Sequence, residues 1–283
     1  KFLHTLKKHN PFKSLGIIIG EKQLPMKSLS SHPKDNNYAL IHSIDSLFAE
    51  KPKHISISFS NEAIIHTTQN VCAYIRGTEV ADSFIVLCAH YDHLGSIGNK
   101  TYYPGAHDNA SGVAALIDIA NYFSKKPHKY SIAFLFFCGE EAGLIGSGDF
   151  VKHPLLPLDK IKALINIDMF CGGNEGIMIV NAKSDETQPI YNSINNINTK
   201  HNYISQIKTR PNAANSDHYF FSTHCPSIFI YTMGGNYGGY HDKYCAGDYC
   251  VFVLSKIYYQ RRCKKYFDWC SKYHCKELCH LFF

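Results

Sequence analysis

Short apolar runs recur along the chain at intervals long enough to hold a helix, and this alternation is the feature that most restricts its fold. The runs are strand-like because they are short and rich in β-branched and aromatic residues. They cover residues 55–59, 71–75, 84–88, 132–137, 164–167, 177–180 and 228–231. Strands that alternate with helices form a mostly parallel sheet with helices on both faces. We therefore predict an α/β fold of three layers, α/β/α, around a mostly parallel, mixed central sheet.

The clearest helical pattern covers residues 111–124, and Pro127 closes it soon afterwards. The apolar positions that recur there at helical spacing are Val113, Leu116, Ile117, Ala120 and Phe123. We expect this helix to face the core. Further helix-sized intervals contain residues 144–151 and 190–197.

Length and composition favour one large domain, since the chain has 283 residues and 45% of them are hydrophobic. We expect an irregular lead-in over residues 1–37 and one α/β domain over residues 38–283. No apolar stretch approaches the roughly 18 residues of a membrane helix, so no membrane span is expected. The net charge of +6 is scattered, with no basic run to follow a phosphate backbone, which argues against nucleic acid as a partner.

Polar side chains suited to metal binding or proton transfer follow several of the apolar runs. They are His90, Asp92 and His93 after residues 84–88, Glu140 and Glu141 after 132–137, Asp168 after 164–167, and Tyr240 and His241 beyond 228–231. His107 and Asp108 stand just before the 111–124 helix. Ligands of open α/β sheets bind at the carboxyl ends of the strands, so we expect these segments to converge on one crevice.

Five carboxylates would then share one partly buried site, at a cost of several kcal/mol per ion unless positive charge compensates. The five are Asp92, Asp108, Glu140, Glu141 and Asp168, and their short motifs contain no Lys or Arg. Each motif alone is more often structural, as a helix cap or solvated charge, but their order together favours metal cations. Imidazole and carboxylate ligands suit zinc, and two ions fit better than one, because a single catalytic zinc needs only three protein ligands.

These residues resemble the family of co-catalytic, two-metal zinc exopeptidases, which includes bacterial leucyl aminopeptidases, glutamate carboxypeptidase and the glutaminyl cyclases. The matching stretches are AHYDHLG (89–95), GAHDNASGV (105–113), CGEEAGLIGS (138–147), NIDM (166–169), SDHYFF (216–221) and YHD (240–242). The resemblance implies the zinc exopeptidase fold, which is phosphorylase/hydrolase-like, with residues 38–283 as the zinc peptidase catalytic domain.

The resemblance also implies the metal ligands. His90 and Asp168 would bind one zinc ion, Glu141 and His241 would bind the other, and Asp108 would bridge the two. His93 and His107 neighbour these ligands and have no assigned contact.

Three further residues would take part in the reaction according to the same resemblance. Asp92 would accept a hydrogen bond from His90 and fix its tautomer. Glu140 would be the general base that takes a proton from water, and Tyr240 would donate a hydrogen bond to the tetrahedral oxyanion. Asp217 and His218 resemble a segment that lines the site and rank below the ligands.

The function implied is a two-zinc metallo-aminopeptidase that acts on peptides with a free amino terminus. One alternative is a glutaminyl cyclase-like enzyme with a single zinc ion, and another is a non-catalytic or truncated peptidase-like module. HDNASG around Asp108 and the full ligand set favour the aminopeptidase. Side-chain specificity and oligomeric state stay open.

The two ends of the chain leave further questions open. The chain opens with Lys1, so a signal peptide could have preceded it, and export to the periplasm or outside the cell is compatible with the sequence. Residues 243–283 form an atypical, basic, cysteine-rich tail. Either a divergent helical tail or a reading-frame slip near Tyr244 would account for it.

Overall fold

The computed structural model describes residues 11–21, 38–50, 53–58, 65–97, 101–171 and 173–234. The chain divides into two compact units, Lys1–Thr67 and Thr68–Phe283. In the first unit, strand β1 (Gly16–Glu21) pairs in parallel with β2 (Ala39–Ile44), and the short turn η1 (Asp45–Phe48) follows. Strand β1 therefore lies inside the segment that we expected to be irregular.

The strand expected at residues 55–59 is wrong over the residues described there. Residues 54–58 are irregular, and Ile55 and Ile57 are 46% and 48% exposed. β-branched composition favours a strand only where neighbouring strands or helices bury the side chains.

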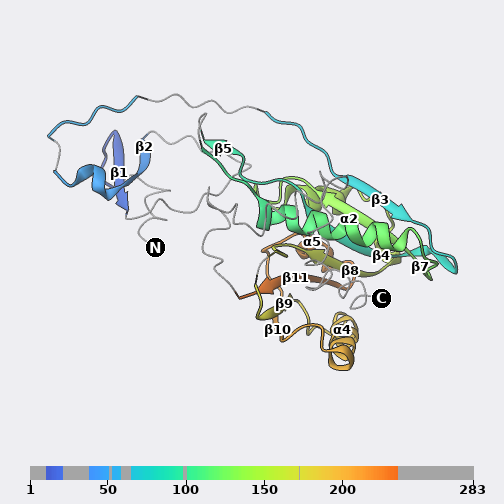
Figure 1. The fold of residues 1–283 in the computed structure, drawn as a ribbon. Helices are drawn as coiled ribbons and strands as arrows, with labels where there is room; N and C mark the ends of the chain where they lie inside the picture. Colours follow the sequence, from blue (N-terminus) through green and yellow to red (C-terminus); the bar gives the residue numbers. More distant parts are fainter. Residues whose placement is uncertain are drawn as a thin grey trace, which may run out of the picture. The chain divides into compact units, whose positions relative to one another are not determined.

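The second unit is built on a seven-stranded sheet with the order β10-β9-β11-β8-β4-β7-β3 (Figure 1). The strands are β3 (Val71–Ile75), β4 (Val80–His90), β7 (Tyr130–Phe137), β8 (Ile161–Ile167), β9 (Gly176–Val180), β10 (Ile207–Arg210) and β11 (Ser227–Met233). β4 runs parallel to β7 and β8, β8 runs parallel to β11, and β9 runs parallel to β10. β3 runs antiparallel to β7, and β9 runs antiparallel to β11. The predicted mostly parallel, mixed sheet is confirmed. A separate antiparallel pair joins β5 (Ser96–Ile97) to β6 (Thr101–Tyr102).

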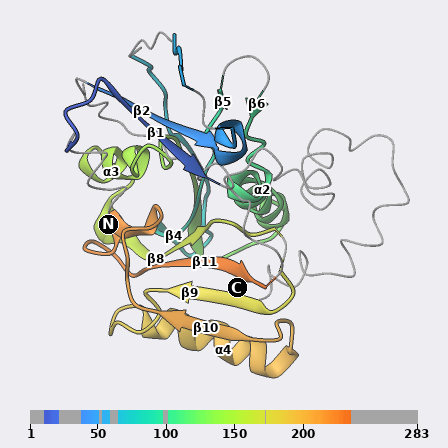
Figure 2. The ribbon, with the colours of Figure 1, turned by 90° about the vertical axis from the view of Figure 1, so that its left-hand side faces the viewer.

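Helices cover both faces of this sheet, which confirms the predicted α/β/α layers. They are α2 (Ser111–Phe123), α3 (Ile145–Lys152), α4 (Gln188–His201) and the short α5 (His218–Phe221), and the turn η3 (Leu158–Lys160) precedes β8. Side chains of β4 alternate between the faces: Leu87 joins the core cluster that contains α2 and α4, and Val86 joins the one that contains α3 and α5. Figure 2 shows α2 and α3 on opposite sides of the strands. None of the described helices is both long and apolar enough to cross a membrane.

Helix α2 confirms the predicted helix but presents a slightly different face to the core. Leu116, Ile119 and Phe123 are buried against the sheet, whereas Ile117 is 43% exposed. Consecutive helical residues point about 100° apart, so Ile117 cannot share the direction of Leu116. The periodic pattern found the helix and misplaced one of its core residues.

The parallel strands end at the same edge of the sheet. His90 of β4 pairs with Phe137 of β7, and two residues earlier Cys88 of β4 pairs with Asn166 of β8. The loops after these three strands therefore leave the sheet side by side. This register brings together the polar residues that follow the strands.

The burial of Leu116 gives a matched test of the core. Replacing Leu116 by Ala should lower the free energy of unfolding by about 2–5 kcal/mol, because the side chain is fully buried between α2 and the sheet. Ile117→Ala, one residue further on the same helix, should cost less than about 1 kcal/mol. Urea unfolding of both variants measures the difference, and equal losses would contradict this orientation of α2.

Candidate metal centre

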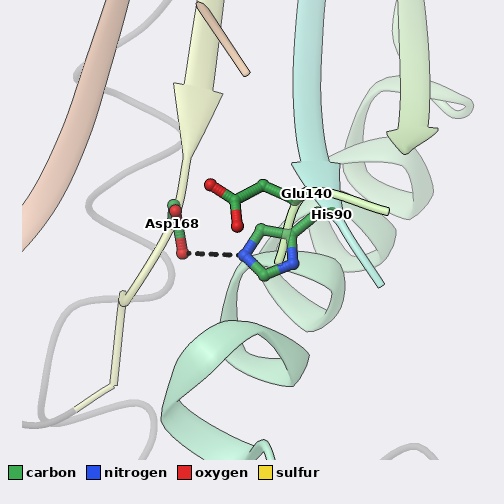
Figure 3. A group of neighbouring side chains, drawn as sticks. All are labelled: His90, Glu140 and Asp168. Atoms are coloured by element: carbon green, nitrogen blue, oxygen red, sulfur yellow. Dashed lines mark hydrogen bonds and ion pairs between the residues drawn. The ribbon is translucent and has the colours of Figure 1, made fainter. Parts of the chain in front are cut away.

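His90, the last residue of β4, faces two carboxylates with one ring nitrogen. Its Nε2 lies 3.0 Å from Oδ1 of Asp108, and the imidazole is fully buried. The same nitrogen lies 3.3 Å from Oδ1 of Asp168 (Figure 3). Burial by itself would lower the pKa of His90, but Asp168 and Asp108 raise it well above its ordinary value. One proton on Nε2 of His90 cannot make a good hydrogen bond to both carboxylates. A cation between Nε2 and the two carboxylates could instead be bound by all three side chains.

Asp92 connects the loop after β4 to the loop after β7. Its Oδ1 and Oδ2 accept hydrogen bonds from the backbone N–H groups of Glu140 and Glu141, at 3.1 and 3.2 Å. Nδ1 of His90 lies 3.1 Å from the carbonyl oxygen of Asp92 and 3.5 Å from its Oδ1. Burial opposes ionisation of Asp92, but these contacts hold its pKa below the usual value. The charged carboxylate fixes His90 and both glutamates at once.

Glu140 completes a first group of possible ligands. His90, Glu140 and Asp168 each offer an atom, and these atoms lie within 4.8 Å of one another. Figure 3 shows the three side chains reaching towards one another from three separate segments. Burial, together with the charges of Asp168, Asp217 and Asp108, raises the pKa of Glu140 to about 9 against the opposing charge of His90.

His93, Asp108 and Glu141 form a second group whose ligand atoms also lie within 4.8 Å of one another. Nδ1 of His93 is 2.7 Å from Oε1 of Glu141. Asp108 belongs to this group and also contacts His90, so it stands between the two groups. No contact was predicted for His93, although it stands one residue after Asp92 in the sequence.

The backbone around Asp108 is fixed by the next side chain. Asn109 donates from Nδ2 to the carbonyl of Ile167 at 3.0 Å, and its Oδ1 accepts from the N–H groups of Gly112 and Met169 at 2.9 and 3.3 Å. A Cβ on Gly112 would lie 2.3 Å from the Ile167 carbonyl oxygen, so only glycine lets the start of α2 approach β8 this closely. These contacts hold Asp108 beside the end of β8.

Asp168, directly after β8, is oriented by a buried chain of hydrogen bonds. Asn166 donates from Nδ2 to Oγ of Ser216 at 2.6 Å, and Ser216 donates from Oγ to Oδ2 of Asp168 at 2.8 Å. Oδ2 of Asp168 therefore accepts the hydrogen bond from Ser216, and Oδ1 is the oxygen that faces His90.

Asp217, His218 and His107 are buried polar residues outside the two groups of possible ligands. Asp217 is fully buried, and burial raises its pKa to about 7. His218 contacts Oδ1 of Asn212 through Nε2 at 3.1 Å, and burial lowers its pKa to about 4. His107 accepts a hydrogen bond on Nδ1 from the backbone N–H of Cys171 at 3.3 Å, which ties two loops together.

Tyr240 and His241 lie outside the described residues, as does the cysteine-rich tail at 243–283. The structure thus brings together His90, Asp92, Asp108, Glu140, Glu141 and Asp168. The donors of the two groups are imidazole nitrogens and carboxylate oxygens, the ligand types of catalytic zinc sites.

Comparison with known proteins agrees with this donor set. The model of peptidase family M28 matches residues 70–249, more than half of the chain. A probable zinc metalloprotease of Pyrenophora teres f. teres is 35% identical over 113 residues, which are 38% of this chain and 24% of that protein. Aminopeptidase YwaD of Bacillus subtilis is 31% identical over 114 residues, 40% of this chain and 23% of that protein. The matched parts are about a quarter of these relatives' length.

Solved structures show the same fold. A leucine aminopeptidase precursor from Bacteroides thetaiotaomicron superposes with a TM-score of 0.56 at 18% identity, covering 75% of each chain. The family match contains His90, Asp108, Glu140, Glu141, Asp168 and His241. From the extent of that match, the chain belongs to peptidase family M28, a family of zinc-dependent peptidases.

Proposed function

We propose that this chain is a two-zinc aminopeptidase that hydrolyses the first peptide bond of peptides with a free amino terminus. The observation that carries the proposal is the position of Asp108. Its Oδ1 lies 3.0 Å from Nε2 of His90, and the same carboxylate belongs to the ligand group of Glu141. A carboxylate shared by two groups of donors is what a bridging ligand between two metal ions requires.

The assignment of ligands follows from this arrangement and from the family. His90 and Asp168 would hold one ion, Glu141 and His241 the other, and Asp108 both. His241 is assigned through the family motif alone. Bound zinc ions would supply the positive charge that polarises the peptide carbonyl and lowers the pKa of a bound water.

We assign to Glu140 the proton transfer that hydrolysis requires. Its carboxylate lies in one group with His90 and Asp168, and Asp92 anchors its backbone. In the proposed reaction the water oxygen attacks the carbonyl carbon, Glu140 accepts the water proton, and the same proton passes to the nitrogen of the leaving amine as the C–N bond breaks. Tyr240 is proposed to donate a hydrogen bond to the oxyanion.

Relatives named as aminopeptidases and zinc metalloproteases support exopeptidase activity, and the catalytic domain predicted over residues 38–283 contains the whole matched range. The alternative of a single-zinc cyclase leaves the second ligand group without a function. The alternative of a non-catalytic module leaves the buried Glu140 without one. Both groups of carboxylates therefore favour the two-zinc hydrolase.

The requirement for a free amino terminus is tested by paired substrates. Matched peptides with free and acetylated amino ends, supplied to the zinc-loaded chain, should be cleaved from the free end only, one residue at a time. Mass spectrometry of the products over time measures this. Cleavage of both sets at equal rates would contradict an aminopeptidase, and cyclisation of amino-terminal glutamine with one zinc per active chain would favour the cyclase.

The role of Glu140 predicts a separation between catalysis and metal binding. Glu140→Gln should lower kcat by at least about 100-fold, because the amide cannot accept a proton, while zinc content stays at the wild-type level. Glu186→Gln, at an exposed position, is the matched control and should leave kcat unchanged. Unchanged turnover by the Glu140 variant would remove this residue from the reaction.

The buried carboxylates also predict how the stability of the metal-free protein depends on pH. Burial raises the pKa of Glu140 to about 9 and that of Asp217 to about 7, so folding disfavours their charged forms. Their contribution to stability is therefore complete below the unfolded-state pKa values near 4 and is lost as pH rises through the folded-state values.

The chelated protein should accordingly unfold at a lower urea concentration at pH 8 than at pH 5.5. Zinc should reduce this loss, because cations favour the ionised carboxylates. Glu140→Gln should weaken the pH dependence of the chelated protein. Parallel pH profiles with and without zinc would contradict this account.

A further inference from the structure

His93 contacts a predicted metal ligand, although no motif assigns it a role. It lies in the loop directly after β4, and its side chain is only 10% exposed. Its Nδ1 is 2.7 Å from Oε1 of Glu141, whose side chain is 5% exposed. The contact is thus shielded from solvent.

A histidine at this position could bind the zinc ion directly or could hold Glu141, and the length of the contact bears on which role it has. Two ligands of one tetrahedral zinc ion, each about 2.0–2.1 Å from it, lie about 3.3 Å apart. The distances from His90 to Asp108 and Asp168, 3.0 and 3.3 Å, approach that value. The distance from Nδ1 of His93 to Oε1 of Glu141 is shorter, 2.7 Å, so one zinc ion could bind both atoms only if they moved apart.

The imidazole of His93 also has a fixed place against the backbone. A Cβ on Gly105 would lie 2.8 to 2.9 Å from three carbon atoms of the His93 side chain, so the ring packs directly on this glycine. Gly105 has φ +64°, which glycine adopts without strain, and begins the segment that leads to Asp108. His93 therefore touches the two segments that carry Asp108 and Glu141.

We propose that His93 is a positioning residue for the metal position that Asp108 and Glu141 form. Its Nδ1 holds Oε1 of Glu141, so that the carboxylate keeps one orientation and its second oxygen stays available to the cation. A glutamate side chain without this contact has rotational freedom that metal binding must remove. The inference rests on the proposed two-zinc function.

The matched variants are His93→Ala and His93→Asn. The asparagine amide nitrogen stands on the same branch of the side chain as Nδ1, so it can donate to Glu141, but it offers no imidazole nitrogen as a zinc ligand. His153→Ala is the control, because Nδ1 of His153 also contacts a carboxylate, 3.2 Å from Oδ1 of Asp149, at an exposed position directly after α3. The full chain is stripped of metal and titrated with zinc against a chromogenic chelator.

We expect His93→Ala to weaken the binding of one of two zinc ions by about 10–100-fold and to leave the other unchanged. His93→Asn should restore most of that affinity, and His153→Ala should change neither ion. Should the alanine variant fail to fold, as judged by circular dichroism, the asparagine variant alone decides, since wild-type affinity supports positioning and a large loss contradicts it.

Two outcomes overturn the inference, and a third overturns its premise. Wild-type affinity in His93→Ala would show that Glu141 does not need the contact with His93. Equal losses in His93→Ala and His93→Asn would make His93 a direct zinc ligand instead. Binding of a single ion by the wild-type chain would contradict the two-zinc function itself, whereas two ions with no effect of His93→Ala would contradict only the role of His93.

Discussion

Electrostatic repulsion between buried carboxylates is the constraint on which this site depends. Asp108, Glu140 and Asp168 converge at one edge of the sheet, and the proton that His90 gains in the metal-free protein offsets part of their charge. Burial, and after it the charges of Asp168, Asp217 and Asp108, raise the pKa of Glu140. Bound cations stabilise a site of this kind, so the buried carboxylates and the imidazole and carboxylate donors both favour metal binding.

Hydrogen bonds from the surrounding loops hold these carboxylates in position despite their mutual repulsion. Asp92 joins two loops through backbone N–H groups, Asn109 joins the start of α2 to β8, and Ser216 holds one oxygen of Asp168. Each support leaves the inner atoms of the ligands directed at one another. Preorganisation of this kind lowers the cost of gathering like charges when the metal binds.

The two halves of the site are supported in different ways. On the side of His90, hydroxyl and amide groups orient Asp168, and these donors cannot bind zinc in its place. On the side of Glu141, the support is itself an imidazole, His93, which could do so. The short contact and the packing on Gly105 are the two observations behind the positioning role proposed for His93.

The sequence by itself determined the α/β/α class and most of the site. Apolar runs such as 84–88 and 132–137 predicted strands because parallel, buried strands are apolar on both faces, and the polar residues after them marked the functional edge. It misjudged residues 55–58, which are not in a strand, and Ile117, which is exposed, because burial depends on what packs nearby. Only the tertiary structure decided that His93 faces Glu141 and that Ser216 orients Asp168. Such contacts join segments far apart in the chain, and their distances follow from strand register and loop packing, which no local pattern records.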